Sequence, residues 1–554
     1  MVTKLYFVFR DVKGEVNMLI KSKRLIGILS AAILGMCITS NSVSAISTNQ
    51  NSSVKLDPTK AIEVDGGKIT GTLSSDSKVA IYKGIPYAAP PVGELRWKVP
   101  QPVDSWRGVK ECTDFGPSAI QSAQAPFMMW SKEFIIDTSK GYSEDCLNLN
   151  VWSKTESTTN KRPVIVYMHG GGFTSGGSSC DVYDGEAIAK KDVVYVSINY
   201  RVGIFGYLAH PELSAESKDG VSGNYGVLDQ VEALKWVKKN ISKFGGDPNN
   251  VTIAGQSAGS ASVNVLTMTP KAKGLFKNAV AMSYNTINTK FDTMAKKEAD
   301  ASELFKGKTL KDMRAMSTDQ LLSLNYSSGP CVDGNVVPKN QLDMLKEGTA
   351  NDVNLMTGMV TGDTLLFSVL PKALFTAPTT MKKADLITAI KTTFGDYADE
   401  CLSAYPINSD EAISQFNEIN QDGMMVLESY LAKARALKSK NPTYIYKFTH
   451  VMPGEKSSEF GAFHTADVPY FLNHFSTERK SYWTQTDYTL GDQMSSYLVN
   501  FAKTGNPNGD NLEKWDAYNG NMSFMNLGDS ISTTTVSKDK AKFWEDYYRS
   551  VLGI

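Results

Sequence analysis

The chain has 554 residues, of which 42% are hydrophobic and 21% are charged, with 58 basic and 58 acidic residues. This ordinary globular composition excludes a wholly disordered chain. The balanced charge, without a basic block, argues against nucleic acid and anionic membrane surfaces as partners and favours a small molecule.

The first 45 residues have the features of a secretory signal. A basic segment at 21–24 precedes an apolar run at 25–38, which is too short to span a bilayer comfortably. Small residues then lead to a predicted cleavage site after Ala45. The sequence therefore predicts a secreted protein whose mature part, residues 46–554, has no stable membrane insertion.

Two features of the N-terminal segment leave alternatives open. Acidic residues upstream of Met18 do not suit a signal, so translation is expected to begin at Met18. Cys37 follows a loosely lipobox-like Leu-Gly-Met, so a lipid anchor is an alternative, as is an uncleaved membrane anchor. The other five of the six cysteines form no CxxC motif and no His/Cys cluster with metal-ligand spacing. We therefore expect neither a metal nor another cofactor.

Strand and helix patterns alternate through the middle of the chain. Buried strands are expected at 162–167, 192–199 and 250–254, and residues 228–240 have the apolar spacing of a helix. Such alternation predicts an α/β fold with a large, mostly parallel central sheet flanked by helices. Residues 295–430 read as mostly helical insertions that form a cap. Because no linker divides the mature part, a single domain is expected.

A G-x-S-x-G motif places Ser257 between Gly255 and Gly259, after an apolar strand and before a helix that begins near Ala258. A strand-to-helix turn this tight leaves no room for side chains at the flanking positions. It also raises the serine oxygen above the sheet edge near a helix N-terminus, which favours developing negative charge. Ser257 is therefore the predicted nucleophile.

The sequence His-Gly-Gly-Gly-Phe at 169–173 follows the strand at 162–167. Acyl transfer passes through a tetrahedral oxyanion, which needs hydrogen-bond donors fixed in advance. Glycine lets backbone N–H groups approach this oxygen without a Cβ in the way. We expect Gly171, Gly172 and Ala258 to form the oxyanion hole.

A serine nucleophile needs a general base, and the chain has five histidines. In α/β hydrolases the base follows the nucleophile and the acid in the chain. His464 lies in a loop bounded by glycine and small residues, whereas His450 ends a strand-like segment and His474 ends an apolar one. We therefore predict His464 as the base.

The acid should lie between Ser257 and His464 in the chain. Asp363 comes directly after a predicted strand, at the sheet edge where α/β proteins place functional groups. Its role would be to hold the imidazole in the useful tautomer. Asp333, in a turn-like sequence, and Asp352 are the alternatives.

Together these residues resemble the type-B carboxylesterases, which include bacterial para-nitrobenzyl esterases and cholinesterases. The resemblance runs from about Val64 to the C-terminus and implies the α/β-hydrolase fold, ester hydrolysis and a Ser–acid–His triad without metal. It also implies two structural ion pairs, Arg96–Glu144 and Arg201–Asp229. The motifs that carry it are GIPYA from Gly84, EDCLNLN from Glu144, HGGGF from His169, NYRVG from Asn199, GNYGVLDQ from Gly223, the serine motif, GAFH ending at His464 and NFAKTGNPN from Asn500.

The chain departs from the family pattern at several positions. Gln256 replaces the usual glutamate before the nucleophile, which makes a preference for cationic substrates less expected. The acid is usually glutamate rather than aspartate. The first cysteine of the family's early disulfide is missing from its usual place, so it is undecided whether Cys112 pairs with Cys146 instead. Tyr284 replaces a usual glycine. We expect Gln256, Phe173 and Tyr284 to contact the substrate.

The sequence thus predicts a secreted serine carboxylesterase that forms an acyl-enzyme intermediate on a small-molecule ester, with a monomer expected. A non-catalytic binding protein on the same fold, a peptidase or amidase, and a specialised polysaccharide or phenolic esterase are the alternatives.

Overall fold

The structure is a computed structural model that describes residues 55–126, 130–156, 161–363 and 380–554. The predicted signal, its cleavage site, Met18 and Cys37 lie outside the described residues. The expected strands at 162–167, 192–199 and 250–254 and the helix at 228–240 are all present, with slightly different ends.

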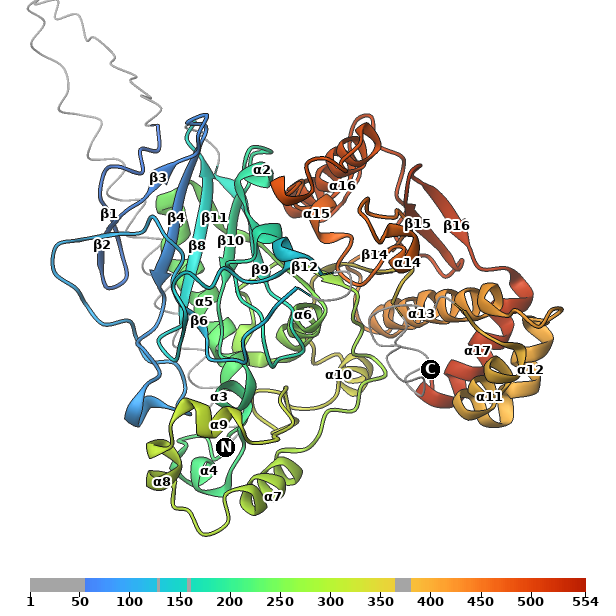
Figure 1. Ribbon diagram of the computed structural model, residues 1–554, viewed down its shortest axis with the longest axis horizontal. Coiled ribbons are helices and arrows are strands. Elements are labelled where there is room, and N and C mark those ends of the chain that lie inside the picture. Colours follow the sequence, from blue (N-terminus) through green and yellow to red (C-terminus); the bar gives the residue numbers. More distant parts are fainter. Residues whose placement is uncertain (1–54, 127–129, 157–160, 364–379) are drawn as a thin grey trace, which may run out of the picture. The chain divides into compact units, whose positions relative to one another are not determined.

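One large sheet runs through the described part of the chain (Figure 1). Its eleven described strands lie in the order β16 (Ser532–Thr535), β15 (Ser523–Leu527), β14 (Thr443–Phe448), β13 (Asn354–Val360), β12 (Asn278–Met282), β11 (Gly246–Gln256), β9 (Arg162–Met168), β10 (Val194–Ile198), β8 (Asn148–Lys154), β4 (Val79–Pro86) and β3 (Thr72–Leu73). Neighbours from β10 through β9, β11, β12, β13 and β14 to β15 are parallel. The pairs towards both edges are antiparallel. The sheet is therefore mostly parallel, as the sequence predicted.

Short strands build two smaller sheets beside the large one. They are β1 (Ile62–Val64), β2 (Gly67–Thr70) and β5 (Val109–Glu111) in one, and β6 (Ser118–Ala119) and β7 (Tyr142–Ser143) in the other.

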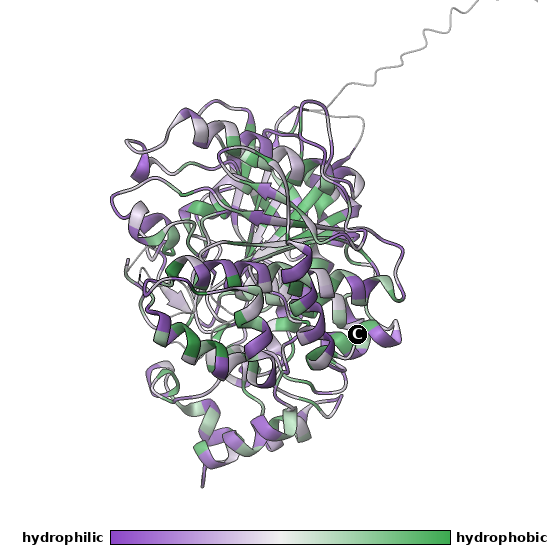
Figure 2. Cartoon of the chain, turned by 90° about the vertical axis from the view of Figure 1, so that its right-hand side faces the viewer, coloured by the Kyte–Doolittle hydropathy of each residue, from purple (hydrophilic) through white to green (hydrophobic). Residues whose placement is uncertain are grey.

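Both faces of the large sheet are covered, which explains why its central strands read as continuous apolar runs. On β9, Val164 and Val166 belong to one hydrophobic cluster, whereas Ile165 and Tyr167 belong to another. The helices that contact strands of the sheet include α2 (Glu186–Ala189), α5 (Tyr225–Asn240), α6 (Ala258–Met268), α13 (Ile413–Ala436) and α16 (Gln485–Thr504). Further helices are α3 (Gly203–Tyr207), α4 (Pro211–Glu216), α14 (Ser457–Phe460), α15 (Val468–Phe471) and α17 (Lys538–Leu552). Figure 2 shows hydrophilic and hydrophobic residues alternating along these helices, as expected for helices with one buried face.

The predicted cap at 295–430 forms two separate helical groups, because β13 passes through the middle of this stretch and joins the sheet. One group packs around Phe305 and Met313, beside α3. The other packs around Phe394 and Trp544, beside α17. The helices outside the flanking layers are α7 (Met294–Leu304), α8 (Leu310–Ala315), α9 (Thr318–Leu322), α10 (Gln341–Glu347), α11 (Lys383–Phe394) and α12 (Ala398–Ala404).

The two ion pairs that the family resemblance implied are present. Arg96 Nε lies 2.7 Å from Glu144 Oε2. Arg201 forms two parallel bonds with Asp229, 2.8 Å from Nε and 2.7 Å from Nη2, and both side chains are buried. Such a bidentate pair fixes the relative orientation of the two segments that it joins.

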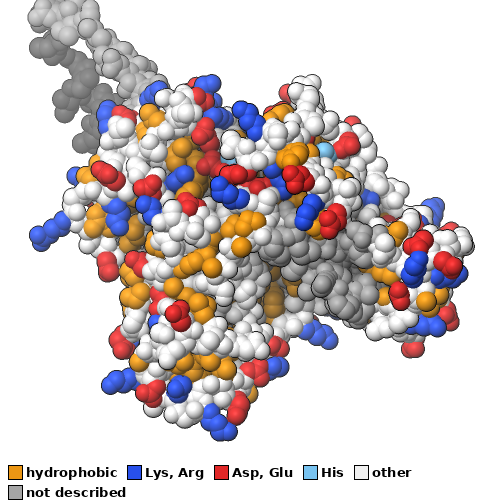
Figure 3. Space-filling model, in the orientation of Figure 1, with side chains coloured by type: hydrophobic (Ala, Val, Ile, Leu, Met, Phe, Trp, Pro, Cys, Tyr) orange, Lys and Arg blue, Asp and Glu red, His pale blue; other side chains and the backbone are white. Residues whose placement is uncertain are grey.

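Cys112 and Cys146 are buried free thiols, so the disulfide that the sequence left open is not formed. On the described part of the face in Figure 3, acidic and basic side chains are interspersed. No helix among the described residues is long and apolar enough to cross a membrane.

Candidate active site

Ser257 sits in a strained turn between β11 and α6. Its backbone has φ 60° and ψ −124°, a region that side-chain-bearing residues rarely adopt. A Cβ built on Gly255 would lie 2.5 Å from the carbonyl oxygen of Gly259, and one on Gly259 would lie 2.1 Å from that of Met168. The expected tight strand-to-helix turn is therefore present, and its two glycines are sterically required.

The glycine loop after β9 passes directly beside this turn. A Cβ on Gly170 would lie 3.1 Å from the Cβ of Ser257. Gly171 and Gly172 both have positive φ angles, 112° and 61°. Ala258 is the first residue of α6, where backbone N–H groups have no acceptor within the helix. The three expected oxyanion donors thus come from the two backbone segments that flank Ser257.

His464 and Asp363 form a buried hydrogen-bonded pair. Nδ1 of His464 lies 2.6 Å from Oδ1 of Asp363, and the two residues are 4% and 1% exposed. Asp363 follows β13, and the N–H of Val360 donates to its second oxygen at 3.2 Å. The N–H of Gly362 donates to the carbonyl of Ala462 at 2.8 Å, which ties the two loops together. This arrangement fixes Nδ1 as the protonated nitrogen of the neutral ring and leaves Nε2 basic.

The other candidate histidines lie in separate polar clusters. His450 bonds to Asp529 at 2.5 Å and to Asp487 at 2.9 Å. His474 lies 3.4 Å from Asp181. These contacts account for the presence of both histidines without a role at Ser257.

The alternative acids are also accounted for by local structure. Asp333 accepts the backbone N–H groups of Asn335 and Val337, both at 2.9 Å, which closes a turn. Asp352 accepts the hydroxyl of Ser439. Neither is the hydrogen-bond partner of Nδ1 of His464.

A cavity of about 310 Å³ joins the nucleophile, the base and the glycine loop. Its described lining consists of Gln124, Trp130, Phe134, Ile135, Gly170, Gly171, Gly172, Thr174, Ser175, Gly176, Cys180, Tyr183, Gln256, Ser257, His464 and Thr465. Asp363 lies behind His464, and no Lys, Arg, Asp or Glu is among the described lining residues. The cavity is thus polar at its base and aromatic on its walls.

Two of the three expected substrate contacts lie outside this described lining. The ring of Phe173 packs against Tyr207, with 5.3 Å between the ring centroids. The carbonyl of Tyr284 accepts hydrogen bonds from Ser260 at 2.7 Å and from Asn264 at 3.2 Å. Gln256, the third, does line the cavity. Its amide nitrogen lies 3.1 Å from Nε2 of His464, a contact that the sequence did not indicate.

Two further buried carboxyls were missed by sequence reasoning. The hydroxyl of Tyr446 donates to Asp467 at 2.7 Å, and that of Thr357 donates to Glu428 at 2.8 Å. Burial, with a smaller contribution from the charge of Asp363, outweighs these hydrogen bonds and raises the pKa of Asp467 to about 6 and that of Glu428 to about 7. The only feature of the sequence that pointed to either carboxyl was the position of Asp467, three residues after His464.

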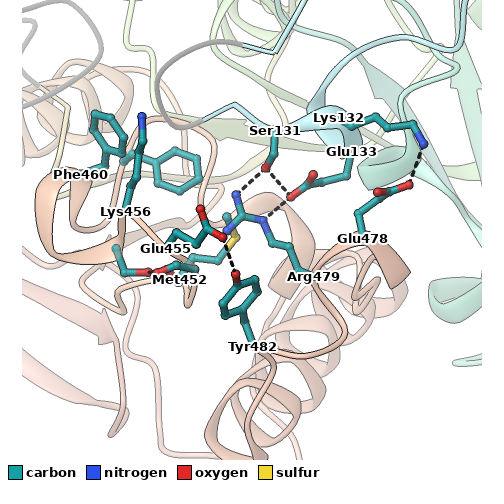
Figure 4. Close-up of a pocket in the computed structure, with 13 residues that line it drawn as sticks. Ser131, Lys132, Glu133, Met452, Glu455, Lys456, Phe460, Glu478, Arg479 and Tyr482 are labelled. Carbon is teal, nitrogen blue, oxygen red and sulfur yellow. Dashed lines mark hydrogen bonds and ion pairs between the residues drawn. The ribbon is translucent and has the colours of Figure 1, made fainter.

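Figure 4 shows a second cavity, of about 390 Å³. Phe463 lines it, and Phe134 lines the first cavity; their rings meet edge to face at 5.7 Å between centroids. Arg479 donates to the hydroxyl of Ser131 at 2.5 Å and to the carboxylate of Glu133. These bonds fix the segment that carries Phe134, one wall of the first cavity.

The mostly parallel sheet and the strained serine turn at the carboxyl end of β11 define an α/β hydrolase. The structure matches a solved PNB esterase with a TM-score of 0.71 at 28% identity, covering 88% of this chain and 99% of that one. In the part that the structure describes, no group of three or more His, Cys, Asp or Glu side chains is arranged to hold a metal ion.

Sequence comparisons identify the family within this class. The model of the carboxylesterase family matches residues 58–544. Fumonisin B1 esterase of Sphingopyxis macrogoltabida is 32% identical over 510 residues, which cover 86% of this chain and 88% of that protein. Liver carboxylesterase 1 of Oryctolagus cuniculus is 29% identical over 544 residues, covering 87% and 92%. The chain belongs to the carboxylesterase family and is a carboxylic ester hydrolase.

Proposed function

We propose that this protein hydrolyses carboxylic esters through an acyl-enzyme formed on Ser257, with His464 as general base and Asp363 as the acid that orients it. The observation that carries the proposal is the 2.6 Å bond between His464 and Asp363, at the base of a cavity that Ser257 and His464 both line. A nucleophile, a base and a group that orients the base are the elements that acyl transfer requires.

The reaction proceeds in two steps. Ser257 attacks the ester carbonyl while Nε2 of His464 takes its proton, and Asp363 stabilises the resulting imidazolium. The backbone N–H groups of Gly171, Gly172 and Ala258 hold the oxyanion. His464 then protonates the departing alcohol. Water, activated by the same base, attacks the acyl-enzyme, releases the acid and restores Ser257.

The cavity favours an uncharged ester group. Its described lining holds no Lys, Arg, Asp or Glu, and Trp130, Phe134 and Tyr183 supply aromatic walls. Charged groups are costly to desolvate in such surroundings unless a partner of opposite charge is present. The substrate is therefore a small neutral ester.

We also propose that the protein is exported by its N-terminal signal and cleaved after Ala45, so that residues 46–554 act as a single-domain monomer without a membrane anchor. The described residues, 55–126, 130–156, 161–363 and 380–554, belong to one compact unit, which supports the domain assignment. N-terminal sequencing of the exported protein tests the cleavage site. A chain that begins at Ile46 supports the proposal, whereas a membrane-bound, lipidated chain that begins at Cys37 contradicts it.

Hydrolysis of para-nitrophenyl acetate and butyrate tests the catalytic assignment. Ser257→Ala should lower the rate at least about 10³-fold, because removing the nucleophile stops acyl-enzyme formation. Ser262→Ala is a matched control, since Ser262 is a buried serine of α6, the helix that follows Ser257, and is not among the described lining residues of the cavity. Equal rates for wild type and Ser257→Ala, both well folded, would refute the proposal.

A further inference from the structure

Gln256 touches the base from a position directly before the nucleophile. It is the last residue of β11 and is fully buried. Its amide nitrogen lies 3.1 Å from Nε2 of His464 and 3.4 Å from Nδ1 of the same ring. The side chain therefore contacts both nitrogens of the imidazole.

These two distances place the amide over the face of the ring. The ring nitrogens flank a single carbon, so an atom in the ring plane that approached both nitrogens this closely would collide with that carbon. An atom in line with the Nε2 lone pair would instead lie far from Nδ1. The amide therefore leaves the in-plane direction of Nε2 open for proton transfer with Ser257.

The other end of the amide has no fixed partner. Oε1 of Gln256 is buried and makes no hydrogen bond within the part of the chain that the structure describes. A buried acceptor without a partner is unfavourable. Rotation of the amide exchanges its oxygen and nitrogen, because the two ends have the same shape. The oxygen can thus be brought over the ring without breaking a hydrogen bond of its own.

We propose that Gln256 is a positioning residue for the general base, whose amide turns its oxygen toward His464 when the imidazole becomes a cation. This inference rests on the proposed function of His464. An amide oxygen carries partial negative charge, so it stabilises the imidazolium that forms in each transition state. No proton or bond is transferred to Gln256.

A neutral amide has a different effect from the glutamate that is usual at this position in the family. A carboxylate over the ring would stabilise the imidazolium in the resting enzyme as well and would raise the pKa of the base. Among the described residues, the charged groups that act on His464 include Asp363, from the loop after β13, and Asp467, from its own loop, which is held by Tyr446 of β14. Gln256 adds stabilisation without adding a further charge.

Two variants separate this role from a substrate contact. In the pH profile of kcat/KM for para-nitrophenyl acetate, Gln256→Glu should move the midpoint of the acid limb up by about 1–2 pH units, because it adds a charge over the ring. Gln256→Met removes the dipole at similar volume. It should lower kcat about tenfold, leave KM nearly unchanged and move the midpoint down.

Gln230 provides the matched control. It is also fully buried with an unpartnered amide oxygen among the described residues, but its amide nitrogen bonds to Ser262 instead. Gln230→Glu should leave the midpoint of the acid limb where it is in the wild type.

The outcomes distinguish this inference from the proposed function. If the wild type is active but Gln256→Glu keeps the wild-type midpoint, the inference alone is overturned. The same holds if the Gln256 variants change KM without changing kcat or the midpoint. An inactive wild type overturns the proposed function. If Gln256→Met does not fold by circular dichroism, the nearly isosteric Gln256→Glu decides the question by itself.

Discussion

Glutamine in place of Glu428 tests whether a buried carboxyl beside the candidate acid is uncharged at neutral pH. Glu428 lies on α13 and is 1% exposed, and the hydroxyl of Thr357 donates to it at 2.8 Å. Burial, opposed by the hydrogen bond and assisted by the charge of Asp363, raises the pKa of Glu428 to about 7. Glu428 therefore holds its proton over much of the range in which the unfolded chain has lost it.

The sign and size of the effect follow from this difference. A carboxyl whose pKa rises from 4.5 to about 7 on folding stabilises the fold fully below pH 4.5 and loses that contribution as the pH rises through 7. The loss amounts to about 3 kcal/mol, at ~1.4 kcal/mol per pKa unit. Glu428→Gln cannot ionise, so its free energy of unfolding should exceed that of the wild type by up to about 3 kcal/mol above pH 7. The gain should shrink toward pH 4.5.

Urea unfolding at about pH 5 and about pH 8 measures this gain. Glu418→Gln is the control, because Glu418 is an exposed residue of the same helix, paired with Lys540. It should change stability by less than about 1 kcal/mol at both pH values. A Glu428→Gln variant that is less stable than the wild type by the same amount at both pH values would show that Glu428 is ionised and held by its partners.

Two further predictions concern the serine turn and the His450 cluster. Gly259→Ala should lower kcat about 100-fold, because the new Cβ would lie 2.1 Å from the carbonyl oxygen of Met168 and displace the turn; esterase activity at wild-type level in a folded variant would contradict this. His450→Asn should lower the free energy of unfolding by about 2 kcal/mol in acidic solution. Burial lowers the pKa of His450, but its hydrogen bonds to Asp487 and Asp529 outweigh burial and raise it overall. The difference in the free energy of unfolding between wild type and His450→Asn should therefore be at its full size below pH 6.5. It should decline as the pH rises through the higher folded pKa of His450, as urea unfolding across this range would show. A difference that grew with pH would refute the assignment.

The features of the candidate site that could be read from the sequence are those imposed by local backbone geometry. Gly255, Gly259, Gly170 and Gly171 are required because backbone atoms pass within contact distance of each, and Gly172 adopts a positive φ angle. Such requirements leave a readable spacing. The strands were visible because a sheet covered on both faces needs continuous apolar runs. The pairing of His464 with Asp363 followed from chain order combined with the position of each residue after a strand or within a glycine-bounded loop.

Side-chain direction and burial were not readable in the same way. Phe173 follows the glycine loop, but its ring turns to Tyr207, which comes from α3. Whether a ring faces the cavity or the core depends on packing between segments distant in sequence. Glu428 shows the same limit, since a glutamate on an amphipathic helix is usually exposed. Only the contact between α13 and β13 makes it a buried group.

Gln256 combines both cases, because its backbone position was predicted and its contact was not. The turn that raises Ser257 also fixes the direction of the preceding side chain, since adjacent residues at the end of a strand point to opposite sides. Once the loop of His464 closes over β11, that side chain meets the imidazole whatever its chemistry. The residue type at 256 therefore sets the charge over the base while the geometry stays constant. Replacing Gln256 by glutamate changes that charge alone, which is why its pH profile tests the chemistry of the base separately from the fold.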